Sequence, residues 1–154
     1  MFSEENLKQL DILKTRYPKS KPLVLPALWM AQRQFGWISP EVMKDVAGLL
    51  DLPVSHVYGV VTFYTMFNTS PVGKYHLQVC TNVSCQLRGG DRLLEHACRR
   101  LNVRLGETTA DERFTVTEVE CLGSCGTAPA VQINDDYHEN LTTERFDGIL
   151  NELR

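Results

Sequence analysis

The apolar residues in positions 1–70 recur at helical spacing and predict a run of short helices. Ser3 can cap the first of these helices, and Pro18 ends it. Pro26 is tolerated in the first turn of the second helix, which Gly36 stops. The helices expected after these are one that opens at Ser39-Pro40 and a short one around Val57 and Val60.

In the second half of the chain the apolar pattern changes to alternation, which is typical of half-buried strands. One strand, Tyr75 to Val79, leads directly to Cys80, and another, Phe114 to Val119, leads to Cys121. A helix from about Leu87 to Asn102 is predicted between them. The remainder is expected to be a strand at Ala130–Ile133, a turn at Asp135-Asp136, a return strand at Tyr137–Leu141 and a closing helix capped by Thr142.

The predicted fold class is therefore α+β, with a helical N-terminal domain in residues 1–70 and a sheet-containing domain in residues 71–154. The order β-α-β-β-α in the second domain is that of a small thioredoxin-like sheet with helices packed against it. The chain has 154 residues, of which 43% are hydrophobic and 23% charged, a composition typical of globular proteins. Its formal net charge of -3 gives no basic footprint of the kind that nucleic-acid binders show, so no nucleic acid partner is expected.

The start of the chain and its hydropathy bear on where the protein works. No apolar run approaches the roughly 18 residues of a membrane span, so no direct membrane insertion is expected. Met1 is followed by Phe2-Ser3-Glu4-Glu5, which predicts neither a signal peptide nor a transit sequence and so a cytoplasmic location. Cysteines stay reduced in that compartment, and close pairs of them are better explained as metal ligands than as disulfides.

Four of the five cysteines form two close pairs, Cys80-x4-Cys85 and Cys121-x3-Cys125, each at the end of a predicted strand. Loops at strand ends carry side chains on a rigid base. A [2Fe–2S] cluster takes two thiolates per iron, so we predict that Cys80 and Cys85 bind one iron and Cys121 and Cys125 the other. Structural zinc also uses four thiolates, usually with C-x2-C spacing, and stays open as an alternative on spacing alone.

The neighbours of these cysteines suit a negatively charged cluster. Arg88 and the Gly89-Gly90 pair stand at the start of the helix after Cys85, where the helix dipole favours an anion. Gly123 and Gly126 let backbone N–H groups approach sulfur. Hydroxyl donors to the cluster are expected from Thr81 and Ser84.

Other candidate residues are given structural roles. Cys98 falls on the apolar face of its helix and is expected to be a buried thiol outside the site. The aromatic stretch Phe63 to Phe67, with Trp29 and Trp37, is expected in the core. No nucleotide-binding motif and no catalytic acid, base or nucleophile is found, so a cluster here would exchange electrons with a partner protein.

Several segments together resemble the 24-kDa iron–sulfur subunits of respiratory NADH:quinone oxidoreductase, complex I. The likeness is specific and extends over nearly the whole chain. The segments that carry it are Gln32-x-x-Phe35-Gly36, Val61-Thr62-Phe63-Tyr64, Pro71-Val72-Gly73-Lys74-Tyr75, Val79-Cys80-Thr81-Asn82-Val83-Ser84-Cys85 and Val119-Glu120-Cys121-Leu122-Gly123-Ser124-Cys125-Gly126-Thr127-Ala128-Pro129.

The resemblance implies a helical part followed by a thioredoxin-like ferredoxin domain that holds one [2Fe–2S] cluster on Cys80, Cys85, Cys121 and Cys125. It further implies an electron-transfer subunit of an NADH dehydrogenase, with its cluster next to the FMN of a 51-kDa type flavoprotein that binds NADH. Other peripheral-arm subunits would be further partners, and the complex would hold the chain at the inner membrane. The same module recurs in NAD-linked hydrogenases and formate dehydrogenases, and the equivalent subunit of such an assembly is the alternative. For the docking surface we expect an apolar patch that includes Phe63, Tyr64, Met66 and Phe67.

Overall fold

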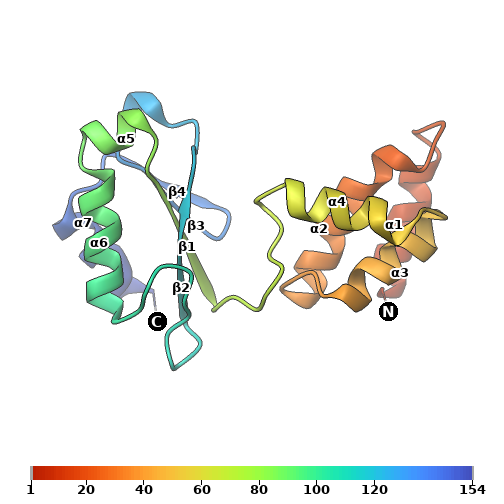
Figure 1. Cartoon of the computed structure of the whole chain (residues 1–154), viewed down its shortest axis with the longest axis horizontal. Helices are drawn as coiled ribbons and strands as arrows, with labels where there is room; N and C mark the ends of the chain where they lie inside the picture. The colour runs from red at the N-terminus through yellow and green to blue at the C-terminus, as the bar shows by residue number, and fades with distance from the viewer. Residues whose placement is uncertain (1, 154) are drawn as a thin grey trace. The chain divides into compact units, whose positions relative to one another are not determined.

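A computed structural model describes residues 2–153, and the chain divides after Pro71 into two compact units (Figure 1). The helices of the first unit are α1 (Glu4–Lys14), the 3-10 turn η1 (Lys21–Leu23), α2 (Val24–Phe35), α3 (Pro40–Leu50) and α4 (Val54–Phe63). None of the helices in residues 2–153 is both long enough and apolar enough to span a lipid bilayer.

The helix ends of the first unit follow the capping signals in the sequence. Ser3 accepts a hydrogen bond from the Asn6 N–H at 3.2 Å and caps α1, and Ser39 does the same for α3 through the Val42 N–H at 3.2 Å. Gly36 ends α2 in the left-handed conformation, with φ of 80°, which glycine adopts without a steric penalty. These three predictions are confirmed.

The core of the first unit lies between its helices and is tied to the segment after α4. The Gln32 side chain donates to the Met66 carbonyl at 2.8 Å and accepts from the Asn68 N–H at 2.7 Å. The core is formed by Phe2, Leu10, Leu23, Val24, Ala27, Leu28, Ala31, Ile38, Val42, Met43, Val46, Ala47, Leu50, Val57, Val61 and Phe67.

The expectation that the whole aromatic stretch lies in the core was wrong for part of it. Phe67 is buried, with its ring edge-on to Trp29 at 5.8 Å between centroids. Phe63, at the end of α4, is 77% exposed, and Tyr64 is exposed beside it. Phe63 follows the buried Val61 by two positions, about half a helical turn, so it lies away from the face that buries Val57 and Val61, and Tyr64 comes after the end of α4.

The second unit contains a four-stranded sheet with the order β2-β1-β3-β4. β1 (Tyr75–Cys80) runs parallel to β2 (Phe114–Val119) and antiparallel to β3 (Val131–Ile133), which pairs antiparallel with β4 (Asp136–His138). The helices are α5 (Val83–Leu87), α6 (Gly90–Leu101) and α7 (Thr143–Glu152), with the 3-10 turn η2 (Cys125–Thr127) between β2 and β3. The four strands and the closing helix follow one another in the predicted order.

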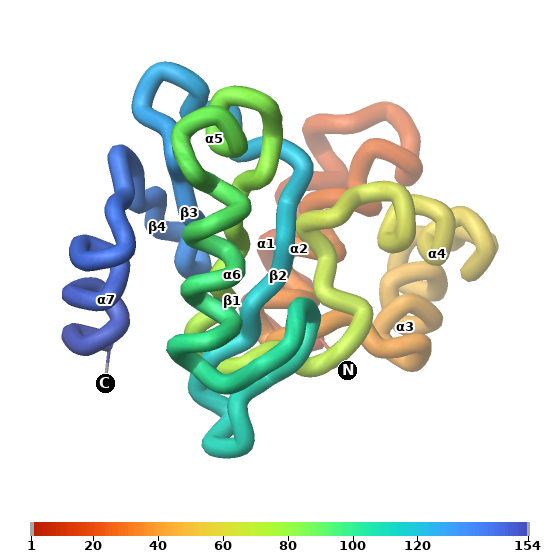
Figure 2. The backbone as a smooth tube through the Cα atoms, turned by 60° about the vertical axis from the view of Figure 1, so that its left-hand side comes forward, coloured from red at the N-terminus to blue at the C-terminus, as the bar shows by residue number. Residues whose placement is uncertain are grey.

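Helices α6 and α7 cover the same face of the sheet, as both views show (Figure 1, Figure 2). Phe146 of α7 is the largest fully buried side chain there, and burial of such a ring contributes about 3 kcal/mol. The second core is formed by Leu77, Val79, Leu93, Ala97, Phe114, Val116, Val131, Ile133, Leu141, Phe146 and Leu150.

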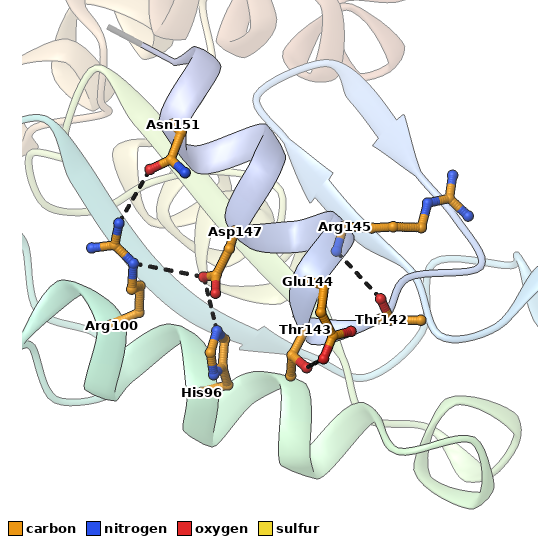
Figure 3. A network of polar contacts seen from close by, with 8 residues as sticks. All are labelled: His96, Arg100, Thr142, Thr143, Glu144, Arg145, Asp147 and Asn151. Atoms are coloured by element: carbon orange, nitrogen blue, oxygen red, sulfur yellow. Dashed lines mark hydrogen bonds and ion pairs between the residues drawn. The ribbon is translucent and has the colours of Figure 1, made fainter.

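Side-chain polar contacts join α6 to α7 on this face (Figure 3). Asp147 of α7 accepts a hydrogen bond from His96 at 2.9 Å and lies 3.6 Å from the Arg100 guanidinium, which also donates to Asn151 at 3.2 Å. Thr142 caps α7 by accepting from the Arg145 N–H at 3.3 Å, as predicted. The two helices are thus held in register by charge as well as by apolar packing.

Two boundaries in the second unit differ from the expectation. The helix predicted from about Leu87 begins at Gly90 as α6, and the short helix α5 before it was not predicted; Gly89, with a left-handed φ of 94°, separates the two. The β3-β4 turn is at Asn134 and Asp135, one residue earlier than expected, since Ile133 pairs with Asp136. Asn134, with φ of 55°, supplies the left-handed residue that this tight turn needs.

Candidate metal centre

The parallel pairing of β1 and β2 brings the two cysteine loops to one edge of the sheet. Cys80 is the last residue of β1 and stands opposite Val119, the last residue of β2. Cys121 follows two residues later, so both loops leave the sheet at its carboxyl edge. α5 and the segment between β2 and β3 lie together at this end of the sheet (Figure 1, Figure 2).

The first pair of thiols is buried and the second is open to solvent. Cys80 and Cys85 are each 3% exposed, and they share a small apolar cluster with the fully buried Ala128 and Ala130. Cys121 and Cys125 are exposed. The Cys80 N–H donates to the Ala130 carbonyl at 3.2 Å, so the segment before β3 closes directly over the end of β1.

The surroundings of Cys85 show which thiols are its neighbours. Burial raises the pKa of the Cys85 thiol to about 11. The nearby Cys80 thiol raises this pKa further through a hydrogen bond and through its charge, and the nearby Cys125 thiol does so through its charge. A backbone hydrogen bond with Ala130 acts in the opposite direction. Cys85 of the first pair therefore lies close both to its own partner and to one member of the second pair.

The second loop is braced by the segment between β4 and α7. The Gly123 N–H donates to the Cys121 sulfur at 3.3 Å. The Asn140 N–H donates to the Thr127 carbonyl at 2.7 Å, and the Thr127 hydroxyl donates to the Glu139 carboxylate. Hydrogen bonds from the hydroxyls of Thr127 and Ser124 lower the pKa of Glu139. These contacts fix the loop that carries Cys121 and Cys125.

Gly90 is a site residue whose role differs from the expected one. A Cβ at this position would lie 2.8 Å from the Cys80 carbonyl oxygen and 3.0 Å from the carbonyl carbon of Cys85. Only glycine permits this approach of α6 to the loop that carries both cysteines. The Gly-Gly pair in the sequence is the signal for it, although the sequence gives no reason for the packing.

Other expected neighbours of the site have different partners. The Thr81 hydroxyl donates to the Glu118 carboxylate, so the expectation of a donor to sulfur was wrong for this residue. Arg88 lines a cavity between α6 and the start of α7. Cys98 is half-buried in the second core, where burial raises its pKa.

The thiols fit a binuclear iron–sulfur cluster in their chemistry. Thiolates are the usual ligands of such clusters, and each iron requires a pair of them. The contact between Cys85 and Cys80 provides one such pair within the apolar cluster. Among residues 2–153, no three His, Cys, Asp or Glu side chains are arranged to enclose a single metal ion.

Comparison with known proteins shows which family the chain resembles. A family described as thioredoxin-like [2Fe-2S] ferredoxin matches residues 10–154. The chain belongs to this family. Membership confirms the predicted thioredoxin-like ferredoxin fold and the [2Fe–2S] cluster as the cofactor.

Relatives extend the match over the whole chain. The chain is 45% identical to the E subunit of NADH-quinone oxidoreductase from Rickettsia conorii, over 99% of this chain and 93% of that protein. It is 44% identical to the E 2 subunit of NADH-quinone oxidoreductase from Rhizobium meliloti, over 96% of this chain and 88% of that protein. In the crystal structure of an NAD+-reducing [NiFe]-hydrogenase in the air-oxidized state, a similar part matches 84% of this chain with a TM-score of 0.73 and 25% identity. This chain spans 22% of that hydrogenase chain.

Proposed function

We propose that this chain is the [2Fe–2S] electron-transfer subunit of the NADH-oxidising part of an NADH:quinone oxidoreductase. The observation that carries the proposal is the 45% identity to the Rickettsia conorii protein over 99% of the chain. The thiol pairs at the carboxyl edge of the sheet support it, because they are the groups that this function needs. No acid, base or nucleophile of this chain takes part in the proposed function.

Within this proposal, Cys80 and Cys85 bind one iron and Cys121 and Cys125 bind the other. A [2Fe–2S] cluster accepts and releases one electron at a time. The chain contributes the four thiolates and excludes water on one side of them through Ala128 and Ala130. The Gly123 N–H, beside the exposed pair, donates to the Cys121 sulfur and stabilises negative charge there.

Metal content and electron paramagnetic resonance test the assignment. We expect about two irons and two sulfides per chain, and a signal that appears only after reduction. Cys121→Ala should lose most of this iron and the signal, while Cys98→Ala, which removes the thiol of the second core, should keep both. Stoichiometric zinc, or equal iron in the two variants, would contradict the proposal.

The proposed partner is a flavoprotein subunit that binds FMN and NADH, and the proposed contact on this chain is the aromatic patch of Phe63 and Tyr64. These two rings are exposed and packed edge-on at 5.0 Å between centroids. Large exposed aromatic groups are frequent anchors of protein interfaces. Met66 and Phe67 are left out of the patch, since Met66 is half-buried and Phe67 is buried in the first core.

Co-purification of the flavoprotein from cells that produce both subunits tests this contact. Phe63→Ser should weaken the association about tenfold, whereas Tyr137→Ser, which removes an exposed ring on β4, should leave it unchanged. Equal recovery of the flavoprotein with both variants would exclude the patch.

A second candidate is the equivalent subunit of an NAD-linked hydrogenase. The structural match to the NAD+-reducing [NiFe]-hydrogenase, with its TM-score of 0.73, favours it. The two candidates differ in their partners. Purification of the native complex and identification of its other subunits separates them, because only one assembly contains a nickel–iron subunit.

Two further parts of the proposal concern organisation and location. We propose that residues 1–70 act as a helical-bundle domain and residues 71–154 as the ferredoxin domain. The whole chain is proposed to work in the cytoplasm, at the peripheral arm of a complex held by the inner membrane. Fractionation of cells, with the chain followed into the peripheral and membrane parts of the complex, tests the location.

A further inference from the structure

Three arginines of the second unit have no partner among residues 72–153. The side chains of Arg88, Arg92 and Arg99 make no hydrogen bond, ion pair or ring contact with any residue that the structure describes there. The other basic side chains of residues 72–153 each have a partner, namely Lys74 with Tyr75, Arg100 with Asp147, Arg104 with Glu107, Arg113 with Asp111 and Arg145 with the Asn140 carbonyl.

All three unpartnered arginines line one cavity. It has a volume of about 540 Å³ and lies between α6 and the segment Leu141–Thr143 at the start of α7. The positive end of the α7 dipole points to this side. The contacts of Asp147 with His96 and Arg100 hold α6 against α7, so the walls of the cavity are fixed (Figure 3).

The charge of the cavity is positive in a chain whose formal net charge is -3. Glu95 is the one acidic residue among those that line it in residues 2–153. Glu144 is in the first turn of α7, next to the cavity-lining Thr143, and its carboxylate accepts a hydrogen bond from the Thr143 hydroxyl at 3.0 Å. Asp147 is engaged with α6, so it does not neutralise the three arginines.

The spacing of the arginines indicates which kind of ligand the cavity suits, a single small anion or an extended acidic peptide. Arg92 and Arg99 lie seven residues apart on α6, which is about two turns and about 10 Å along one face. One phosphate would have to draw both long side chains together across this rise, whereas carboxylates spaced along an extended chain can meet each guanidinium where it stands. An extended polyproline-type segment repeats its side-chain direction every third residue, at about 9 Å.

We propose that this cavity is a docking site for an acidic segment of a partner protein, in which carboxylates spaced along an extended backbone pair with Arg88, Arg92 and Arg99. Arginine suits such pairing because its planar guanidinium binds a carboxylate through two parallel hydrogen bonds. The site is separate from the cysteine centre and does not depend on the cluster. This charged docking site would be a second partner contact, in addition to the apolar contact proposed for Phe63 and Tyr64.

Binding of a synthetic peptide with glutamate at every third position tests the proposal on the full-length, cluster-loaded protein. We expect binding at low salt that weakens as salt rises to about 0.15 M, and none by the same peptide with glutamine. Arg92→Gln with Arg99→Gln should weaken binding at least about tenfold. Arg104→Gln with Arg145→Gln removes the same charge elsewhere and should change binding less than about twofold.

Three outcomes would overturn the proposal. Equal weakening in both double variants would show that net charge, and not the cavity, attracts the peptide. Tighter arginine-dependent binding of inorganic phosphate or ADP would identify a small-anion site, and binding of phosphatidylglycerol vesicles alone would identify a lipid surface. Arg88→Gln, a single change in the exposed linker between α5 and α6, serves if the double variant fails to fold. Visible absorption of the cluster is recorded in each variant. Absence of this absorption would count against the proposed function, whereas the peptide-binding result alone decides the proposal for the cavity.

Discussion

The α-carbon of Gly90 lies directly against the carbonyl oxygen of Cys80, so that a Cβ there would be 2.8 Å from this oxygen. The neighbouring atoms are backbone and cannot rotate away. We expect Gly90→Ala to displace α6 from the loop of Cys80 and Cys85 and to lower the stability of the second unit by about 1–3 kcal/mol. The measurement is the iron retained per chain and the denaturant midpoint of the visible absorption.

Gly148 provides the matched control for this change. It lies in α7, and a Cβ there would meet no atom within 4 Å. Gly148→Ala should keep full iron content and gain up to about 1 kcal/mol, because alanine favours the helical state. If the two variants retain the same iron and the same midpoint, the close approach of Gly90 is not required by the site.

The strands and helix ends were accessible from the sequence because local chemistry sets them. Alternation placed β1 and β2, and the hydroxyls of Ser3, Ser39 and Thr142 marked three helix starts. The break at Gly89 was not predicted, because the apolar period continues across it. Glycine permits the left-handed backbone there, and the adjacent Gly90 packs against Cys80, a long-range contact that the apolar pattern does not show.

The candidate site was predictable in its residues but not in its burial. Alternation places each cysteine at the end of a strand, and a helix between the two strands is typical of the parallel pairing that brings both ends to one sheet edge. The burial of Cys85 depends on Ala128 and Ala130, which are set in place by the pairing of β3 with β1. The exposure of Phe63 depends in the same way on where α4 ends, and not on how apolar the residue is.

Thr115 is a buried polar residue that we expect to be important for stability. It is 3% exposed, and its hydroxyl accepts from the Gly73 N–H at 2.7 Å and lies 2.7 Å from the Thr108 hydroxyl. Thr115→Val keeps the shape but leaves the buried Gly73 N–H without an acceptor, which should cost about 1–3 kcal/mol. Denaturant unfolding followed by the cluster absorption measures the loss.

The first unit offers an internal control for Thr115→Val. Trp29 and Trp37 are both in that unit, so tryptophan fluorescence reports its unfolding separately. Thr62→Val removes an exposed hydroxyl that donates to the Tyr58 carbonyl, and it should change stability by less than about 0.5 kcal/mol. A loss of the same size for Thr62→Val would argue against a special role for the Thr115 hydroxyl.

His76 should make the second unit less stable in acid. Burial lowers the pKa of His76 from its usual 6.5, and its ring nitrogen is paired with the Thr117 hydroxyl at 2.8 Å. The unfolded chain then takes up a proton more readily than the folded one. The stability that this histidine contributes is therefore complete above about pH 6.5 and declines as the pH falls below that value.

Amide hydrogen exchange of the β1 residues between pH 8 and pH 5 measures the effect of His76, after correction for the intrinsic pH dependence of exchange. His76→Gln should flatten the acid-dependent loss of protection, while His56→Gln, in the first unit, should leave it as in the parent chain. An unchanged slope in His76→Gln would assign the acid dependence to other groups.

The thiol of Cys85 should be the slowest of the site cysteines to react once the cluster has been removed. Its pKa is raised to about 11 by burial and by Cys80 and Cys125, and the thiolate is the reactive form. At pH 8 only about one thiol in a thousand is ionised at such a pKa, so alkylation should be at least about 100-fold slower than for the same cysteine in the denatured chain. Peptide mapping after timed iodoacetamide treatment gives the rate, which should rise steeply as the pH approaches 11. Cys80→Ala removes one cause of the raised pKa and should speed the reaction at Cys85. Equal rates in the folded and denatured chains would show that the first pair is open in the cluster-free protein.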